Sequence, residues 1–219
     1  LIPLFSVGDS DRHHSAEENE KVETEMAALS TVPYRVQAAG APEKDLLITR
    51  EVGYETKEQI CRELAQLEPN TVLDLDFRAI RFMDVSCADE MIVRILARLE
   101  AGEYPDRFIT LSHIDVQHRE NIEAALKIAK KTTLVRQEES WEVLGELVSS
   151  HRTALAKIME MRSVTARELQ QELDYNTINE SSTRLTFLYQ RCLVAREPFR
   201  EAVRGGGRQF RYLSLNHPN

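Results

Sequence analysis

The stretch that most constrains the fold is 71–99, in which a strand pattern is followed at once by a helix pattern. Over its first part, apolar side chains alternate with Asp74 and Asp76, which is the period of a β-strand. After a short connector, the apolar residues have the spacing of a helix that buries one face. These residues are Ala88, Ile92, Ile95, Leu96 and Leu99. The stretch therefore predicts an α/β arrangement, a sheet with helices packed on it.

The turn between this strand and this helix is Asp-Val-Ser at 84–86. Ser86 followed three residues later by Asp89 is the pattern of a helix N-cap with its capping-box partner. Phosphorylation of Ser86 is an alternative, because a phosphate at a helix N-terminus is electrostatically favourable. Anion binding at the same helix end is a third interpretation. The acidic Asp84 and Asp89 oppose both alternatives, so we expect a cap and keep Ser86 as a possible regulatory residue.

These residues carry a family resemblance. Phe-Met-Asp at 82–84 is similar to the approach to this helix in the STAS domains of anti-sigma-factor antagonists. Ala-Asp-Glu at 88–90 resembles the STAS-like variant more closely. In the classical antagonists a phosphorylatable serine directly follows the Asp, and Val85 stands at that position here. The resemblance implies a regulatory domain, over 33–148, that senses a partner, a small ligand or a modification.

The rest of the first half fits a small mixed sheet with helices. Residues 1–32 are polar and acidic, and we expect a flexible leader there. The predicted strands are 34–38 and 46–50, which could form a hairpin, then 108–112, and 133–135 at a sheet edge. The predicted helices begin at the capping box 56–59, run over about 115–130, and begin again at Ser140 to continue toward 161.

Residues 149–219 have a different pattern. Capping boxes at 165–168 and 177–180 open two helices joined by a short connection, as in a helix-turn-helix. A Gly-Gly-Gly run then precedes the alternating segment 209–215. Three helices followed by a hairpin with a flexible tip resemble the winged-helix family. The predicted fold class is thus a STAS-like α/β domain followed by an α+β winged-helix domain, and this resemblance implies binding to duplex DNA.

The helix from Ile178 is the predicted recognition helix. A step of 100° per residue places Ile178, Leu185, Leu188 and Tyr189 on the core side and Phe187 on the outer side. Asn, Ser, Thr, Gln and Arg side chains suit base edges and phosphates in the major groove. The predicted DNA-binding residues are Asn179, Ser182, Thr183, Arg184, Thr186, Gln190, Arg200, Arg204 and Arg208. An ordinary solvated helix face and a mobile hairpin tip with solubilising charges are the alternatives.

Charge is unevenly distributed along the chain. The net charge of the whole chain is −8, which alone argues against nucleic acid. From His151 onward, however, 11 Lys and Arg stand against 7 Asp and Glu, so this part carries +4 and the rest carries −12. Such asymmetry is what a regulator with one DNA-facing domain would show.

Few residues suggest enzymatic chemistry. The GxxxxGK[ST], GxSxG and HExxH motifs do not occur. His113 and His118 would diverge on a helix, so we expect a surface pair rather than a metal site. Asp74 and Asp76 are expected on a solvent face. We therefore predict that the chain is not an enzyme and uses no metal and no cofactor.

The cysteines and the hydropathy pattern indicate the compartment. Cys61, Cys87 and Cys192 are far apart, which fits a reducing cytoplasm better than a disulfide framework or a zinc site. Cys87 is expected to be a small buried residue. No apolar run approaches the ~20 residues that span a bilayer, so we expect no membrane association.

Together these patterns predict a cytoplasmic transcriptional regulator. The C-terminal domain would bind double-stranded DNA as a homodimer, because helix-turn-helix proteins read paired half-sites. The STAS-like domain would sense its signal, for example through a regulatory protein partner. The alternative is a protein–protein interaction or scaffold module of an anti-sigma-type signalling pathway, without direct DNA binding.

Overall fold

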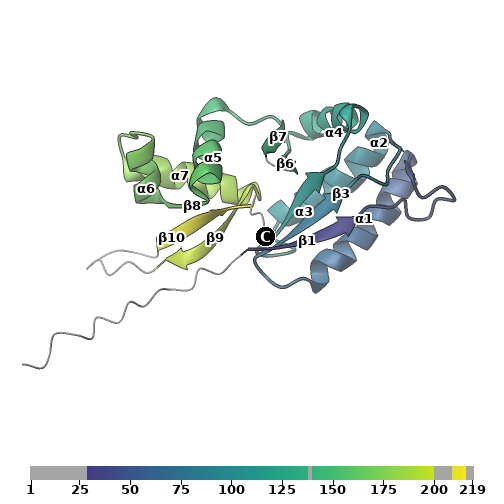
Figure 1. Cartoon of the computed structure of the whole chain (residues 1–219), viewed down its shortest axis with the longest axis horizontal. Coiled ribbons are helices and arrows are strands. Elements are labelled where there is room, and N and C mark those ends of the chain that lie inside the picture. The colour runs from purple at the N-terminus through teal and green to yellow at the C-terminus, as the bar shows by residue number, and fades with distance from the viewer. Residues whose placement is uncertain (1–28, 138–139, 200–208, 216–219) are drawn as a thin grey trace, which may run out of the picture.

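The chain folds into a mixed α/β structure whose largest sheet is mostly parallel (Figure 1). This computed structural model describes residues 29–137, 140–199 and 209–215. The elements form two groups, which we call the sheet unit (29–147) and the C-terminal unit (148–215), each within the described ranges. Most of the predicted leader, 1–28, lies outside the described residues.

The large sheet has the strand order β1-β3-β5-β6-β7. Its strands are β1 (Ser30–Arg35), β3 (Thr71–Asp76), β5 (Arg107–Ser112), β6 (Thr132–Arg136) and β7 (Trp141–Gly145). The first four are parallel, and β7 is antiparallel to β6. Because β6 lies between β5 and β7, it is an inner strand rather than the predicted edge strand.

Two short strands, β2 (Leu46–Leu47) and β4 (Phe82–Met83), pair in parallel beside the large sheet. The hairpin predicted between 34–38 and 46–50 is therefore wrong. The first strand begins at Ser30 and pairs with β3, and the second pairs with β4. Both pairings are parallel and join segments distant in the sequence, which local turn signals do not encode.

One face of the large sheet is covered by helices. They are α1 (Thr49–Gln66), α2 (Val85–Ala88), the π-helical turn η1 (Asp89–Val93), α3 (Arg94–Glu100) and α4 (Val116–Ala129). Leu73 and Leu75 of β3 are buried in one cluster with residues of all these helices. Alternation along the strand sends Val72, Asp74 and Asp76 to the opposite face. The helix α1 begins seven residues before the predicted capping box, and Thr56 lies inside it, accepting a hydrogen bond from the Ala39 N–H at 3.0 Å.

The C-terminal unit combines three helices with an antiparallel sheet. Its elements are α5 (Ser149–Met161), β8 (Ser163–Thr165), α6 (Ala166–Glu172), α7 (Ile178–Gln190), β9 (Val194–Phe199) and β10 (Gln209–Ser214). The strand order is β8-β10-β9, and β10 is antiparallel to both neighbours. The capping box predicted at 165–168 is confirmed, because Thr165 and Glu168 each accept the other's backbone N–H.

The helix predicted from Ser140 is wrong, because 141–145 forms β7. Gly145 ends this strand at a φ of +88°, and a Cβ there would lie 2.2 Å from the Lys131 carbonyl oxygen. No single long helix therefore joins the two units, and α5 begins afresh at Ser149.

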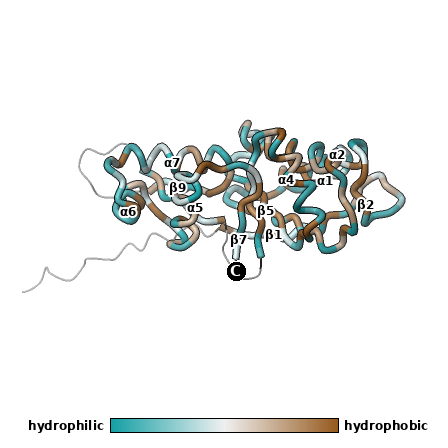
Figure 2. Tube along the Cα trace, turned by 90° about the horizontal axis from the view of Figure 1, so that it is seen from above, coloured by the Kyte–Doolittle hydropathy of each residue, from teal (hydrophilic) through white to brown (hydrophobic). Residues whose placement is uncertain are grey.

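The two units share a hydrophobic core. Val72, Phe108, Leu134 and Val143, from the sheet face opposite the helices, belong to one buried cluster with side chains of α5 and α7. In Figure 2 the hydrophobic colour follows β5 where the two groups of elements meet. Among the described residues, no helix has the length and apolar character needed to cross a membrane.

Candidate functional site

The helix α7 begins at a side-chain cap. Thr177 Oγ1 accepts the Glu180 N–H at 3.2 Å, which is one half of the capping box predicted at 177–180, and the Glu180 carboxylate pairs with Arg184. Ser181, Leu185 and Leu188 are fully buried, and the helix packs on α5 and α6. The opposite side of α7 faces solvent, which gives the unit an exposed helical surface.

The predicted DNA-binding residues of α7 occupy this surface to different degrees. Asn179, Ser182, Thr183 and Gln190 are exposed, and Thr186 is half-buried. Thr183 Oγ1 donates to the Asn179 carbonyl oxygen at 2.8 Å, which holds its side chain along the helix. These residues span the length of α7 and present amide and hydroxyl groups to solvent.

Arg184 differs from these neighbours because its guanidinium is engaged within the unit. Its Nη2 lies 2.8 Å from Glu180 Oε1, and its guanidinium carbon lies 4.3 Å from the centre of the Tyr175 ring. The side chain is 19% exposed. In this arrangement Arg184 joins α7 to the α6–α7 turn.

Two side chains of α7 lie opposite to their predicted sides. Phe187 was expected to point outward, but its ring stacks on the His151 ring of α5, with centroids 3.9 Å apart. Ile178 was expected in the core and is 44% exposed. The reason is that α5 packs along one flank of α7, so the buried sector is displaced from the one that the sequence spacing suggests.

Arg200, Arg204 and Arg208 lie outside the described residues. The strands on either side are defined, and Phe199 of β9 pairs with Gln209 of β10. The segment 200–208, which carries these arginines, therefore connects the paired ends of two antiparallel strands.

At the strand-to-helix turn, the cap is Asp84 and not Ser86. Asp84 Oδ1 accepts the Cys87 N–H at 2.6 Å and the Ser86 hydroxyl at 2.8 Å, and Oδ2 accepts the Thr49 N–H at 2.9 Å. One carboxylate thus caps α2 and the start of α1. Burial alone would raise the pKa of Asp84, but these hydrogen bonds lower it below its usual value. Because α2 already begins at Val85, Ser86 lies inside the first turn.

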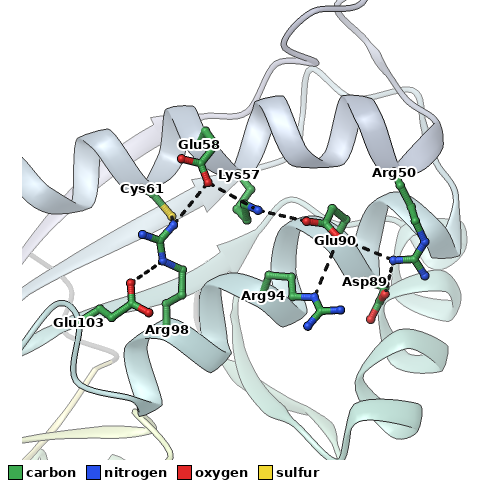
Figure 3. Close-up of polar contacts among 9 residues, drawn as sticks. All are labelled: Arg50, Lys57, Glu58, Cys61, Asp89, Glu90, Arg94, Arg98 and Glu103. Atoms are coloured by element: carbon green, nitrogen blue, oxygen red, sulfur yellow. Dashed lines mark hydrogen bonds and ion pairs between the residues drawn. The ribbon is translucent and has the colours of Figure 1, made fainter.

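The Ala-Asp-Glu motif at 88–90 places two carboxylates against α1 (Figure 3). Arg50 Nη1 lies 2.8 Å from Asp89, and Lys57 Nζ lies 3.1 Å from Glu90. The Lys57 side chain is only 9% exposed, and the ion pair with Glu90 offsets the cost of burying it. Gly53 permits the close approach, since a Cβ there would lie 3.0 Å from the Cys87 carbonyl oxygen.

A buried polar group lies on the sheet face opposite the helices. Asp74 is 2% exposed and accepts the hydroxyls of Thr110 and Ser112 at 2.8 Å each, and Arg136 lies 3.3 Å away. Asp76 is also buried and pairs with Arg78 at 2.7 Å. The predicted solvent face for the two aspartates is therefore wrong. Alternation in β3 indicated their common face, but the partners of Asp74 come from the neighbouring strands β5 and β6.

The structure also shows where the remaining candidates for chemistry, His118 and Cys87, lie. His118 was expected at the surface but is buried, and this burial lowers its pKa. Cys87 is fully buried as predicted, and burial raises the pKa of its thiol to about 12, so the thiol stays protonated. Within the described ranges, no group of three or more His, Cys, Asp or Glu could hold a metal ion.

Comparison of the chain with protein-family models, curated proteins and solved structures found no match.

Proposed function

We propose that the protein is a transcriptional regulator whose C-terminal unit is a winged helix that binds duplex DNA. The observation that carries this proposal is the exposed polar surface of α7, the second helix of a helix-turn-helix pair that is followed by an antiparallel hairpin. The order helix, strand, two helices, two strands, with β10 between β8 and β9, agrees with that assignment.

The side chains on this surface suit recognition of DNA. Asn179 and Gln190 can pair with adenine, and Ser182 and Thr183 can contact base edges or phosphates. Arg200, Arg204 and Arg208 fall in the segment that joins β9 to β10, where cations can contact phosphates or enter the minor groove. Arg184, engaged by Glu180 and Tyr175, acts in this proposal by holding α7 to the turn before it.

The sheet unit is proposed to be STAS-like and regulatory. The support is the Ala-Asp-Glu motif at 88–90, whose two carboxylates bind α1 through Arg50 and Lys57. A change at this helix junction by a partner, a ligand or modification of Ser86 would alter the packing of α1 and α2. We propose that the regulator works as a homodimer on paired half-sites.

The test of DNA binding is selection of duplexes from a random pool, followed by fluorescence anisotropy on the selected sequence. Replacing Asn179, Thr183 and Gln190 with Ala should weaken binding by about a hundredfold or more, because each of the three base contacts contributes roughly 1–3 kcal/mol. The control replaces Gln59, Gln66 and Gln117, exposed helical residues of the sheet unit, with Ala. Equal affinity of the two variants would contradict a role of α7 in recognition.

The second candidate function is a protein-interaction module without direct DNA binding. The net charge of −8 favours it, since a strongly acidic chain repels phosphates. A stoichiometric protein partner recovered by pull-down, together with no enrichment of any duplex, would support this candidate over the first.

A further inference from the structure

The C-terminal end of α7 is held by the sheet unit at two points. Tyr189 Oη donates to Asp106 Oδ1 at 2.9 Å. Arg191 Nη1 donates to the Lys130 carbonyl oxygen at 3.0 Å and lies 3.4 Å from Glu100 Oε1. We call this set of interactions the α7 contact. Its partners in the sheet unit are Glu100, the last residue of α3, Asp106 in the connection from α3 to β5, and Lys130, the C-cap of α4.

Opposite charges meet at the α7 contact and favour its present geometry. The helices α3, α4 and α7 all end here, and each C-terminus carries partial negative charge. Arg191 and Lys131 supply positive charge, and Lys131 Nζ pairs with the second oxygen of Glu100. The Glu100 side chain is 16% exposed, so water screens these ion pairs only in part. Glu100 therefore joins a cation of each unit.

The backbone at the α7 contact is also specialised. Cys192 has a φ of +55°, and its N–H donates to the Tyr189 carbonyl oxygen at 2.8 Å, which ends the helix. The Cys192 side chain packs against the hydrophobic cores of both units. Asp106 has a φ of +56°, and its carbonyl oxygen accepts the Asn70 N–H. The backbone is thus turned sharply at Cys192, just after Arg191, and at Asp106, so both sides of the contact begin at a turn of fixed conformation.

The contact and the exposed surface of α7 lie at different positions on one helix. Asn179, Ser182 and Thr183 are toward its N-terminal end, about 9–15 Å along the helix from Tyr189 at about 1.5 Å per residue. A rotation of α7 about its C-terminal end would therefore displace these side chains relative to the hairpin β9–β10. The sheet unit leaves the surface uncovered, so the α7 contact positions it without masking it.

The same contact lies at the end of a helix that begins at Val85, directly after its cap Asp84. The elements α2, η1 and α3 are consecutive from Val85 to Glu100. Figure 3 shows this helix tied to α1 near both ends, by Asp89 with Arg50 and by Arg98 with Glu58 at 3.4 Å. A displacement of the helix at its Ser86 end would therefore move Glu100 against Arg191.

We propose that Glu100 and Asp106 are positioning residues for α7, and that through them the sheet unit sets how α7 is presented to DNA. The consequence for DNA affinity rests on the proposed function, whereas the positioning of α7 does not.

The test uses the full chain with two matched pairs of substitutions. The test variant, Tyr189→Phe with Glu100→Gln, removes one hydroxyl and one charge of the α7 contact. The control, Tyr54→Phe with Glu43→Gln, makes the same chemical changes in the sheet unit at positions that do not contact α7. Tyr54 is exposed on α1, and Glu43 pairs with Arg81 at 2.9 Å. Each variant is compared with the unmodified chain under conditions in which urea denaturation shows it to be fully folded.

Hydrogen exchange of the amides at 185–193 is the first readout. We expect faster exchange there in the test variant and unchanged exchange in the control. The second readout is affinity for the selected duplex, which should fall about fivefold in the test variant, a typical coupling between sites. Both variants lose one carboxylate, and this loss alone would strengthen DNA binding equally in each. The weaker binding expected of the test variant has the opposite sign, so the change in charge cannot account for it.

The outcomes separate the two proposals. Equal exchange at 185–193 in the two variants would overturn the positioning role of Glu100 and Asp106. Faster exchange in the test variant with equal DNA affinity in the two variants would overturn the inferred effect of the contact on DNA binding. Faster exchange in the test variant, with no DNA binding by the unmodified chain, would support the positioning of α7 and overturn the proposed function. A smaller dependence of affinity on salt in the test variant would also overturn the inference, because positioning residues contact no phosphate.

Discussion

At the scale of the residue, the Asp84 carboxylate fixes the start of the helix that follows β4. The carboxylate accepts hydrogen bonds from two backbone N–H groups, one in the first turn of α1 and one in the first turn of α2. Neither N–H group has a partner within its own helix. Ser86 adds a hydrogen bond to the same carboxylate but caps neither helix. A phosphate on Ser86 would lie beside this carboxylate, and the repulsion would disturb the cap.

We expect Asp84→Ala to destabilise the fold by about 1–2 kcal/mol, as loss of an N-cap does. Ser86→Ala should cost about 0.5 kcal/mol, because it removes one hydrogen bond and leaves both backbone N–H groups paired. Urea denaturation at neutral pH measures both values. Equal costs would mean that Ser86 contributes to the cap.

The pH dependence of the Asp84→Ala effect provides its control. The pKa of Asp84 is lowered in the folded state, so its stabilisation is fully present above the unfolded pKa. It is lost as the pH falls through the lower, folded pKa. The difference in stability between the unmodified chain and Asp84→Ala should therefore shrink in acid, and a difference independent of pH would contradict the role of the carboxylate.

At the scale of the element, the glycine that ends β7 is required by its surroundings. Gly145 combines a positive φ with a backbone oxygen where a Cβ would lie. Gly102 also has a positive φ, of +78°, but a Cβ there would meet nothing within 4 Å. Substitution at Gly102 therefore measures the free-energy cost of the backbone conformation alone, and substitution at Gly145 adds the cost of a steric clash.

Gly102→Ala should therefore destabilise the fold by about 1 kcal/mol, the cost of a left-handed conformation. Gly145→Ala should cost about 2 kcal/mol or more, because strands β6 and β7 must also separate locally. Thermal and urea denaturation measure both. A Gly145→Ala effect no larger than that of Gly102→Ala would show that the β6–β7 pair adjusts without strain.

Local patterns predicted the elements whose determinants are local. The strands β3 and β5, the helix α4 and the capping box at Thr165 follow from alternation, periodicity and side-chain caps. The strand β7 could not be predicted in this way, because the spacing of Trp141 and Leu144 also suits a helix and pairing with β6 decides between the two. Phe187 and Asp74 were misplaced for a related reason, since α5 and the neighbouring strands decide what those side chains contact.

At the scale of the whole molecule, the sheet unit and the C-terminal unit are packed through one hydrophobic cluster. Phe108 and Leu134 of the sheet join Leu155 and Leu188 of the C-terminal unit. The charged α7 contact adds a second link. This packing differs from two domains on a flexible linker, in which movement of one would leave the other unaffected.

We expect the chain to unfold in a single cooperative transition. Trp141 is the one tryptophan of the chain and packs at the edge of the common cluster, so its fluorescence reports on the junction of the units. Circular dichroism reports on helices of both units. The two transitions in urea should coincide, whereas separate midpoints would show that the units unfold independently.

The most direct measurement for the central claim is the salt dependence of binding to a selected duplex by fluorescence anisotropy. We expect the dissociation constant to rise steeply with salt, and Arg204→Ala with Arg208→Ala to weaken binding and lower the logarithmic slope by about 2. Arg62→Ala with Arg94→Ala, the same charge change on exposed helical positions of the sheet unit, should leave the slope unchanged. Absence of binding to any duplex at low salt, or an equal change in slope for both variants, would contradict DNA binding by the C-terminal unit.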